Sequence, residues 1–190
     1  RIESRGLGDV YKRQELYNDL HKNNNCETSN QISDYNSKLY YIEDIPYLFH
    51  FIFFGYTEFT FIHYMSVKTC YDNNKHATIN LYYTQQPHNN QYWEDTKKYV
   101  NLIYVEPPEH IFNNKLLSYA HKADIIRLQK LIQHGGIYLD IDVLTIKSFE
   151  KILKETNKDC IMGLQATNTQ YEGLCNACLL YTSPSPRDSI

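Results

Sequence analysis

Between residues 45 and 165, apolar runs of strand length alternate with segments whose apolar residues recur every three or four positions. The first pattern is typical of buried strands, and the second is typical of helices that bury one face. The expected strands are 47–54, 78–84, 102–105, 137–140 and 160–165, with a further extended run at 143–146, and the expected helices are 57–73, 90–99, 116–133 and 148–155. This alternation predicts an α/β fold with a mainly parallel sheet.

The clearest helix signal covers residues 116–133, where apolar residues stand at helical spacing throughout. Gly135 and Gly136 follow, and either can adopt the left-handed conformation that ends many helices. The run 137–140 then predicts a short buried strand that ends in an acidic pair. Because the connections are short, we expect the first three strands, 47–54, 78–84 and 102–105, to pair in parallel, with 137–140 in the same sheet.

Composition indicates one globular domain. The chain has 190 residues, 42% of them hydrophobic, which suffices for one core but not for two ordinary domains. The formal net charge of −3 leaves no excess of Lys and Arg for a phosphate backbone, so we expect no nucleic-acid partner. The chain contains no apolar run of about 18 residues, so we expect no transmembrane segment in it.

The cysteines weakly favour a cytoplasmic location. Five cysteines are an odd number, reduced thiols are expected in a chain of this length, and the sequence has no Asn-x-Ser/Thr sequon. An anchor elsewhere in a longer chain would allow Golgi or other membrane association. The one Cys-x-x-Cys, at 175–178, lacks the second pair that a zinc ribbon needs, and we expect isolated histidines such as His50 to be structural.

Both ends of the chain differ in character from its middle. Residues 1–14 contain RGLGDVYKRQ and residues 178–190 read CLLYTSPSPRDSI, and both resemble translated sequencing-adapter read-through. We expect these ends to be artefacts and residues 45–177 to be the N-terminal part of a domain truncated at its C-terminus. The alternative is a basic arm and a Ser/Pro-rich tail. Residues 15–44 are polar and predict a linker or helical arm, with at most one short helix at 15–22.

Candidate chemistry is concentrated at the end of the strand 137–140. Asp140 and Asp142 flank Ile141, and in extended chain both carboxylates would project to one face of the sheet. They would then address one divalent cation, or one cation and a neighbouring hydroxyl group. Open α/β sheets bind their ligands at the carboxyl ends of their strands. Because an Asp-x-Asp also arises by chance, its context decides its meaning.

The preceding helix supplies a second charged pair. Asp124 and Arg127 stand three positions apart, hence on one face, and the apolar residues on the opposite side point them away from the core. Taken alone, such a pair is most simply a surface ion pair that contributes little to stability.

In context, these residues resemble a known family. Residues 121–143, HKADIIRLQKLIQHGGIYLDIDV, resemble the sugar-binding region of the Asp-x-Asp glycosyltransferases of family 32, relatives of the glucosylating domains of large clostridial toxins. The family pattern runs from a small or aromatic residue through Asp, two apolar residues and Arg, then along a helix to Gly-Gly, an aromatic strand and Asp-x-Asp. Every part of that pattern is present here.

Two further segments carry the resemblance, which extends over roughly residues 43–177. Residues 45–55, IPYLFHFIFFG, are similar to the first strand of the family, and Phe53 stands where the family has a tryptophan that stacks on the nucleotide base. Asn176 and Ala177 are similar to the Asn-Ala that ends the family's next conserved stretch.

The resemblance implies a GT-A fold, which is Rossmann-like, and transfer of a hexose from a nucleotide-diphosphate sugar with retention at the anomeric carbon. A Mn²⁺ or Mg²⁺ ion would stabilise the departing diphosphate. It implies that Asp142 binds the metal directly, with Asp140 as a second metal ligand or a partner of ribose or sugar hydroxyls. Asp124 would bind the donor sugar, Arg127 the sugar or phosphate, and Phe53 the base. Asp140, Asp142 and Arg127 are then the expected catalytic residues.

Two alternatives stay open. Nucleotidyltransferases also place an acidic pair on a strand after Gly-Gly, but at a longer separation than the four residues from Gly136 to Asp140. The other alternative is a fragment that binds a nucleotide sugar without turnover, because the family's last metal ligand and acceptor-site residues would lie beyond this chain. The acceptor, whether glycan, lipid or protein, is not identified by the sequence.

Overall fold

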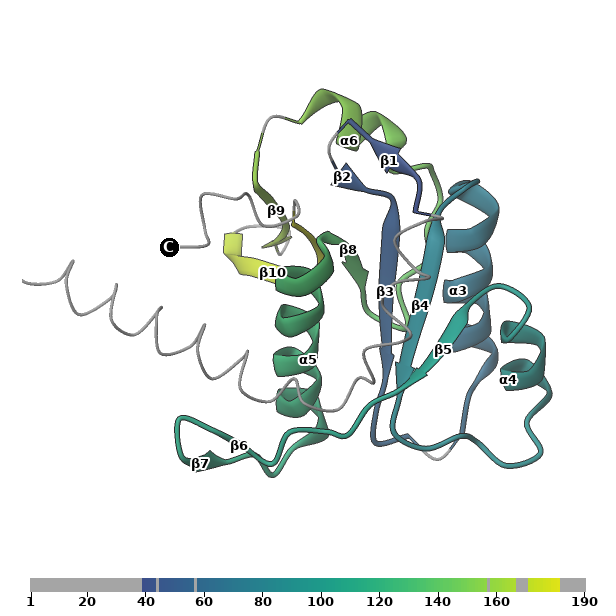
Figure 1. Cartoon of the computed structure of the whole chain (residues 1–190), viewed down its shortest axis with the longest axis vertical. Helices are drawn as coiled ribbons and strands as arrows, with labels where there is room; N and C mark the ends of the chain where they lie inside the picture. The colour runs from purple at the N-terminus through teal and green to yellow at the C-terminus, as the bar shows by residue number, and fades with distance from the viewer. Residues whose placement is uncertain (1–38, 44, 57, 157, 167–170, 182–190) are drawn as a thin grey trace, which may run out of the picture.

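A mainly parallel sheet forms the centre of the computed structural model, which describes residues 39–43, 45–56, 58–156, 158–166 and 171–181. Within these ranges six strands lie in the order β5-β4-β3-β8-β10-β9 (Figure 1). They are β3 Leu48–Phe53, β4 Thr78–Tyr83, β5 Asn101–Tyr104, β8 Gly136–Leu139, β9 Cys160–Ala166 and β10 Tyr171–Tyr181. The expectations for 1–14, for a helix at 15–22 and for 182–190 lie outside the described residues.

Four neighbouring strands of this sheet are parallel. β3 pairs with β4 along its whole length, β4 pairs with β5, and β3 pairs with β8 through Phe49 and His50. The predicted parallel pairing of the first three strands is therefore confirmed, as are the place of 137–140 in the same sheet and the mainly parallel α/β fold class.

Helices cover both faces of the sheet (Figure 1). On one side lie α3 Phe61–Asn73 and α4 Gln91–Thr96, and on the other lies α5 Tyr119–His134. A last short helix, α6 Glu150–Glu155, contributes Leu153 to the core on the α3 side. These are the four helices that the sequence predicted in this part of the chain. Each begins later than expected, and α4 also ends earlier, at Thr96 instead of Tyr99.

The side chains of β3 alternate between the two faces, as in any strand. Phe49, Phe51 and Phe53 belong to the core cluster that contains Val67 of α3 and Trp93 of α4. Ile52 and Phe54 belong to the second cluster, which contains Ile126 and Leu131 of α5. Because both faces are covered, every residue of β3 is buried.

The strand β10 was not predicted, because a polar loop was expected after residue 165. It lies between β8 and β9 and is antiparallel to both. Leu179 and Leu180 pair with Tyr138 and Ile137 and are buried, so the fold extends past Ala177 into the segment expected to be an adapter artefact. The origin of that segment stays a prediction.

Three shorter segments also differ from expectation. β1 Tyr41–Ile42, inside the expected linker, pairs with β2 Ile45–Pro46. β6 His110–Ile111 and β7 Asn114–Lys115 form a hairpin whose two turn residues, Phe112 and Asn113, have positive φ, as tight hairpin turns require. Residues 143–146 form no strand.

Gly135 and Gly136 make the tight connection from α5 to β8. Both have positive φ, 64° and 94°, where the sequence predicted a left-handed conformation at one of the two. At Gly136 a Cβ atom would lie 2.4 Å from the carbonyl oxygen of Leu48, so the approach of β8 to β3 requires glycine. Because the connection is so short, α5 runs back along the sheet, and its N-terminal half lies beside the carboxyl end of β8.

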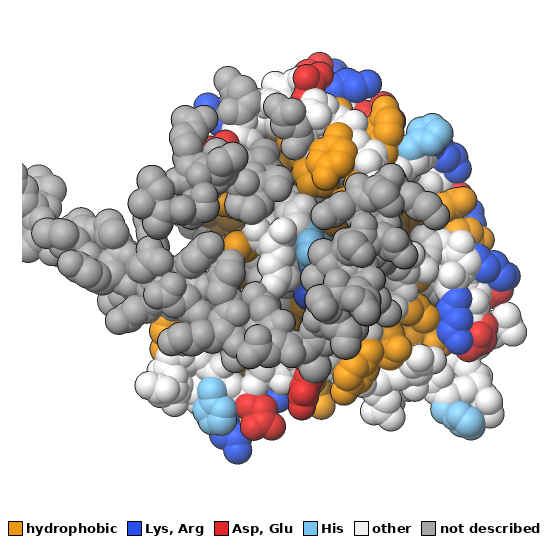
Figure 2. All heavy atoms as spheres, viewed as in Figure 1, with side chains coloured by type: hydrophobic (Ala, Val, Ile, Leu, Met, Phe, Trp, Pro, Cys, Tyr) orange, Lys and Arg blue, Asp and Glu red, His pale blue; other side chains and the backbone are white. Residues whose placement is uncertain are grey.

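The surface of the described residues carries mixed charge. On the face shown in Figure 2, Lys and Arg side chains are interspersed with Asp and Glu side chains rather than gathered into one field. Within the described ranges, no helix has the length and apolar character needed to cross a membrane.

Candidate active site

A cleft of about 380 Å³ opens at the carboxyl ends of β3 and β8, beside the N-terminal half of α5. This is the edge at which parallel α/β sheets bind their ligands. Four of the five residues singled out from the sequence line the cleft: Asp124, Arg127, Asp140 and Asp142. The structure therefore brings together the charged residues of two segments that the family resemblance connects.

One face of α5 forms a wall of the cleft. Ala120, Ala123, Asp124 and Arg127 all line it, at the spacing of one helix face. The expectation that both charged residues point away from the core is wrong for Arg127, whose side chain is 8% exposed, whereas that of Asp124 is 43% exposed. Small side chains at 120 and 123 leave the space that the cleft occupies, whereas Ile126 and Leu131 pack into the core.

Arg127 is a buried cation, with only 8% of its side chain exposed. Its Nη2 lies 3.1 Å from Oδ1 of Asp124 and 3.3 Å from Oδ1 of Asp140, and its Nη1 donates to the carbonyl oxygen of Asn176 at 2.7 Å. Its guanidinium lies 4.2 Å from the ring centroid of Tyr138. This arrangement joins α5, β8 and β10 through one charge, so Asp124 and Arg127 are not a simple surface pair.

Asp140 is held on one of its two carboxylate oxygens. Tyr138 donates its hydroxyl to Oδ1 at 2.6 Å, and Arg127 contacts the same atom. Burial raises the pKa of Tyr138, so its hydroxyl stays protonated and keeps donating. The backbone N–H of Asp140 donates to the carbonyl oxygen of Ala177 at 2.8 Å. Among the described residues no group bonds Oδ2, which leaves that oxygen to a ligand.

Asp142 lies in a turn and not in extended chain. β8 ends at Leu139, and the N–H of Val143 donates to the carbonyl oxygen of Asp140 at 3.0 Å. The expected alternation of faces along Asp140, Ile141 and Asp142 is therefore wrong, although all three residues line the cleft. Asp142 is exposed, and no hydrogen bond or ion pair holds its carboxylate within the part of the chain that the structure describes.

A buried histidine lies near Asp142. Burial lowers the pKa of His63, while the charge of Asp142 opposes that shift. Its Nδ1 accepts a hydrogen bond from the backbone N–H of Thr60 at 3.1 Å, so the neutral ring carries its proton on Nε2. This hydrogen bond caps the first turn of α3, which lies beside the acidic turn.

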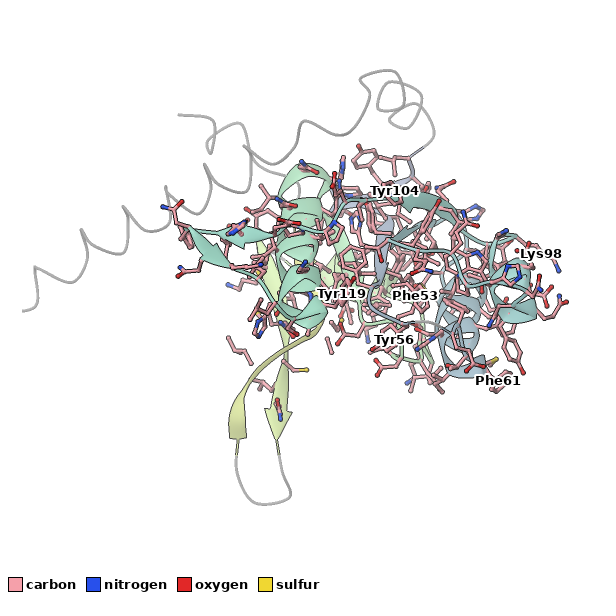
Figure 3. All side chains as sticks on the ribbon, turned by 90° about the horizontal axis from the view of Figure 1, so that it is seen from below. Phe53, Tyr56, Phe61, Lys98, Tyr104 and Tyr119 are labelled. Carbon is pink, nitrogen blue, oxygen red and sulfur yellow. The ribbon has the colours of Figure 1, made fainter. Side chains whose placement is uncertain are left out.

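The structure does not bring Phe53 to the cleft. Phe53 is 1% exposed, with its ring centroid 5.1 Å from that of Phe59 and 5.7 Å from that of Trp93. Tyr56, which is 54% exposed, lines the cleft instead, and its ring stacks on Phe53 at 5.5 Å and 20° (Figure 3). The aromatic side chain that follows this strand and is open to a ligand in the cleft is therefore Tyr56.

Tyr119 is a second half-exposed aromatic residue of the cleft. A Cβ atom at Gly55 would lie 2.7 Å from its ring, so the ring packs directly on the backbone of that glycine. Figure 3 shows Tyr119 on α5, across from Tyr56 and Phe53. Sequence reasoning missed Tyr56, Tyr119 and Tyr138 as site residues. For Tyr56 a signal existed, since it directly follows the glycine that ends the first strand.

The acidic residues fit a cation shared with a phosphate ligand. The described residues contain no group of three or more His, Cys, Asp or Glu side chains that could hold a metal by themselves. Mg²⁺ and similar hard cations are usually held by one or two carboxylates together with substrate phosphates. Asp140 and Asp142 supply that donor set, and Asp142 is the carboxylate whose charge no neighbouring cation neutralises.

Two other side chains carry groups that often act in catalysis, His50 and Cys178, but their surroundings keep them unreactive. His50 is fully buried, with Nδ1 3.0 Å from the hydroxyl of Tyr82 and Nε2 2.8 Å from the carbonyl oxygen of Gly135. Burial lowers the pKa of His50 to about 3, so it is neutral at ordinary pH. Burial also raises the pKa of Cys178 to about 11, which keeps its thiol protonated and unreactive.

Comparisons with known proteins identify the family to which the chain is similar. The profile of the family described as "glycosyltransferase sugar-binding region containing DXD motif" matches residues 60–159, more than half of the chain. That range contains α3, α5 and the acidic turn, and hence every charged residue of the cleft named above.

Individual relatives were found by sequence and by structure. Over 129 residues the chain is 31% identical to Glucan organizing enzyme 1 of Cryptococcus neoformans var. grubii serotype A. The aligned region covers 65% of this chain and 34% of that protein. The chain thus spans about a third of the length of this curated relative. The solved structure "PaToxG Glycosyltransferase" superposes with a TM-score of 0.47 at 17% identity, covering 88% of this chain and 65% of the other.

Proposed function

This chain belongs to the family of glycosyltransferases whose sugar-binding region contains a DXD motif, and from that membership we propose the reaction in which it takes part. The reaction is transfer of a hexose from a nucleotide-diphosphate sugar, with retention at the anomeric carbon and with Mn²⁺ or Mg²⁺ as cofactor. The observation that carries the proposal is the convergence of Asp124, Arg127, Asp140 and Asp142 on one cleft at the carboxyl edge of the sheet.

Asp142 is the residue that would hold the cation. Its carboxylate is exposed at the cleft, while that of Asp140 is already compensated by Arg127. A divalent cation bound there would supply Lewis-acid stabilisation for the negative charge that develops on the departing diphosphate. Asp142 positions the diphosphate end of the donor at the end of β8.

Asp124 and Asp140 would receive the hydroxyl groups of the donor sugar or ribose. Both are carboxylates with acceptor capacity left over, because the contacts of Arg127 fall on one oxygen of each. Arg127 then acts by fixing these two carboxylates and not by clamping the phosphate, because its terminal nitrogens already contact Asp124, Asp140 and the backbone of Asn176. This assignment differs from the direct donor contact expected from the family resemblance.

Tyr56 would stack on the nucleotide base. Its ring is exposed on the cleft and is backed by the buried ring of Phe53, which restricts its motion. An aromatic face that is fixed before binding loses little conformational entropy when a base stacks on it.

The second candidate is a chain that binds a nucleotide sugar without turnover. The observation that favours it is that the acceptor side of the reaction is not assigned to any described residue. The printed name of the curated relative refers to glucan, so a glucan belongs among the acceptors to be tested, beside lipid and protein acceptors.

Release of nucleotide from a panel of UDP- and GDP-hexoses, with Mn²⁺ or with a chelator, separates these candidates. We expect release from at least one donor that requires the cation, and a product sugar whose anomeric configuration by NMR is that of the donor. Release that a chelator leaves unchanged would contradict the cation, and an inverted product would contradict retention. Donor binding without release would favour the second candidate.

A further inference from the structure

The acidic turn is held from the side of α3 by a buried serine. Ser66 is 0% exposed, and its Oγ donates to the carbonyl oxygen of Val143 at 2.6 Å. The same hydroxyl lies 3.5 Å from the carbonyl oxygen of Asp140. Since the N–H of Val143 bonds that same carbonyl of Asp140, Ser66 reaches both ends of the turn that carries Asp142.

The two ends of this turn are held in different ways. At its start, the N–H of Asp140 donates to Ala177 of β10, so the sheet fixes it. At its end, residues 143–146 belong to no strand. Buried backbone groups need partners. The sheet supplies none for the carbonyl of Val143, and the hydroxyl of Ser66 does.

A row of polar side chains on α3 continues this contact along the chain. Thr69 accepts a hydrogen bond at Oγ1 from the N–H of Thr145 at 3.1 Å, and Asn73 donates to the carbonyl oxygen of Thr145 at 2.9 Å. Ser66, Thr69 and Asn73 stand three and four positions apart, hence on one face of the helix. This face of α3 supplies residues 143–145 with hydrogen bonds that a neighbouring strand would otherwise supply. Ser66 is the member of the row that bonds the turn itself.

We propose that Ser66 is a positioning residue for Asp142. Its hydroxyl fixes the end of the acidic turn, so the exposed carboxylate of Asp142 stays at the cleft without a side-chain bond of its own. The inference rests on the proposed function, because it takes Asp142 as the ligand of the cation. Residues that orient a metal ligand from behind it contribute strongly to metal affinity, although they touch neither metal nor substrate.

Two matched variants test the inference. Ser66→Ala removes the hydroxyl without adding volume, and alanine favours the helix. Thr69→Val also removes a hydroxyl that bonds the same segment, but one that contacts Thr145, beyond the turn. The probe is Mn²⁺ in the presence of UDP, and separately GDP, with bound ion measured by electron paramagnetic resonance. We expect Ser66→Ala to weaken Mn²⁺ binding about tenfold or more, and Thr69→Val to bind the ion like wild type.

Amide hydrogen exchange gives a second readout that needs no cation. In Ser66→Ala the N–H of Val143 should exchange faster, because the turn opens more often, whereas in Thr69→Val the faster exchange should be at Thr145. A role in stability alone would lower the stability of both variants and leave Mn²⁺ binding the same in both.

The Asp142→Asn variant distinguishes the two ways in which the inference can fail. If wild type binds Mn²⁺, Asp142→Asn does not, and Ser66→Ala binds like wild type, the positioning role is overturned and the cation site stands. If Asp142→Asn binds Mn²⁺ like wild type, the proposed cation site is overturned, and the role of Ser66 falls with it.

Discussion

The hydroxyl of Tyr138 lies 2.6 Å from Oδ1 of Asp140, and the same residue presents its ring face to Arg127 at 4.2 Å. One buried side chain of β8 therefore contacts both members of an ion pair. The hydroxyl holds the anion, and the ring covers the cation from the core side. The consequence is that both contacts fall on Oδ1, so Oδ2 keeps its capacity to accept hydrogen bonds from a ligand.

Tyr138→Phe removes the hydroxyl and keeps the ring. We expect the free energy of unfolding to fall by about 1 kcal/mol, because a hydrogen bond to a charged acceptor is lost while Arg127 still compensates Asp140. Tyr138→Leu also loses the cation–π contact and should cost about 1 kcal/mol more. Urea denaturation measures both. Equal stability of the Phe and Leu variants would show that the ring face contributes nothing to holding Arg127.

Variants of Tyr56 and of Phe53 should have different main defects, the first in nucleotide binding and the second in stability. Tyr56→Ala should weaken nucleotide binding by about 1 to 3 kcal/mol, the usual range for a base stacked on an aromatic ring, and change stability little. Phe53→Leu should lower stability by about 1 kcal/mol through poorer packing and should weaken nucleotide binding less than Tyr56→Ala does, because it loosens the support of the Tyr56 ring without removing that ring. Calorimetry with UDP and GDP, together with thermal unfolding, distinguishes them. The reverse pattern would return the base site to Phe53.

The position of Phe53 illustrates a limit of sequence patterns. A strand covered on one face alternates apolar and polar residues, so its faces can be assigned from the sequence. β3 is buried on both faces, and its last three residues and the residue that follows them, 51–54, are all apolar. Nothing in such a run indicates that Phe53 points toward α3 while Phe54 points toward α5. The strand was therefore predictable, and the face on which its aromatic residues lie was not.

The parallel strands and the charged residues of the cleft were predictable because local signals define them, whereas the order of the strands was not predicted. The helix from Tyr119 to the glycine pair has clear periodicity, and Gly136 needs a conformation that only glycine adopts readily. The strand β10 and the turn at Asp142 depend on partners distant in sequence, Leu139 and Ser66, and had no such signal. The burial of Arg127 was missed for the same reason. The residues that cover it, Tyr138 and Asn176, are distant from it in sequence.

Stability should fall on mild acidification because of His50. Its pKa in the folded chain is about 3, lowered from 6.5 by burial. Below pH 6.5 the unfolded chain therefore binds a proton that the folded chain does not, and stability is lost as the pH falls from 6.5 toward 3. His50→Gln removes this proton uptake. Between about pH 7 and about pH 5, wild type should lose about 2 kcal/mol more than the variant. If the urea midpoints of the two proteins change by the same amount across this range of pH, the account is contradicted.

The assignment of the cation to Asp142 is tested most directly by the rate of nucleotide release from the donor as a function of Mn²⁺ concentration. Asp142→Asn should lower the rate by about 100-fold or more, because it weakens the cation that stabilises the departing diphosphate. Asp72→Asn is the matched control, since Asp72 pairs with Lys68 on the outer face of α3, outside the cleft. We expect this control to keep the wild-type rate and the wild-type dependence on Mn²⁺. If Asp142→Asn also keeps both, Asp142 does not hold the cation, and the acidic pair at the end of β8 has no catalytic role of the kind proposed.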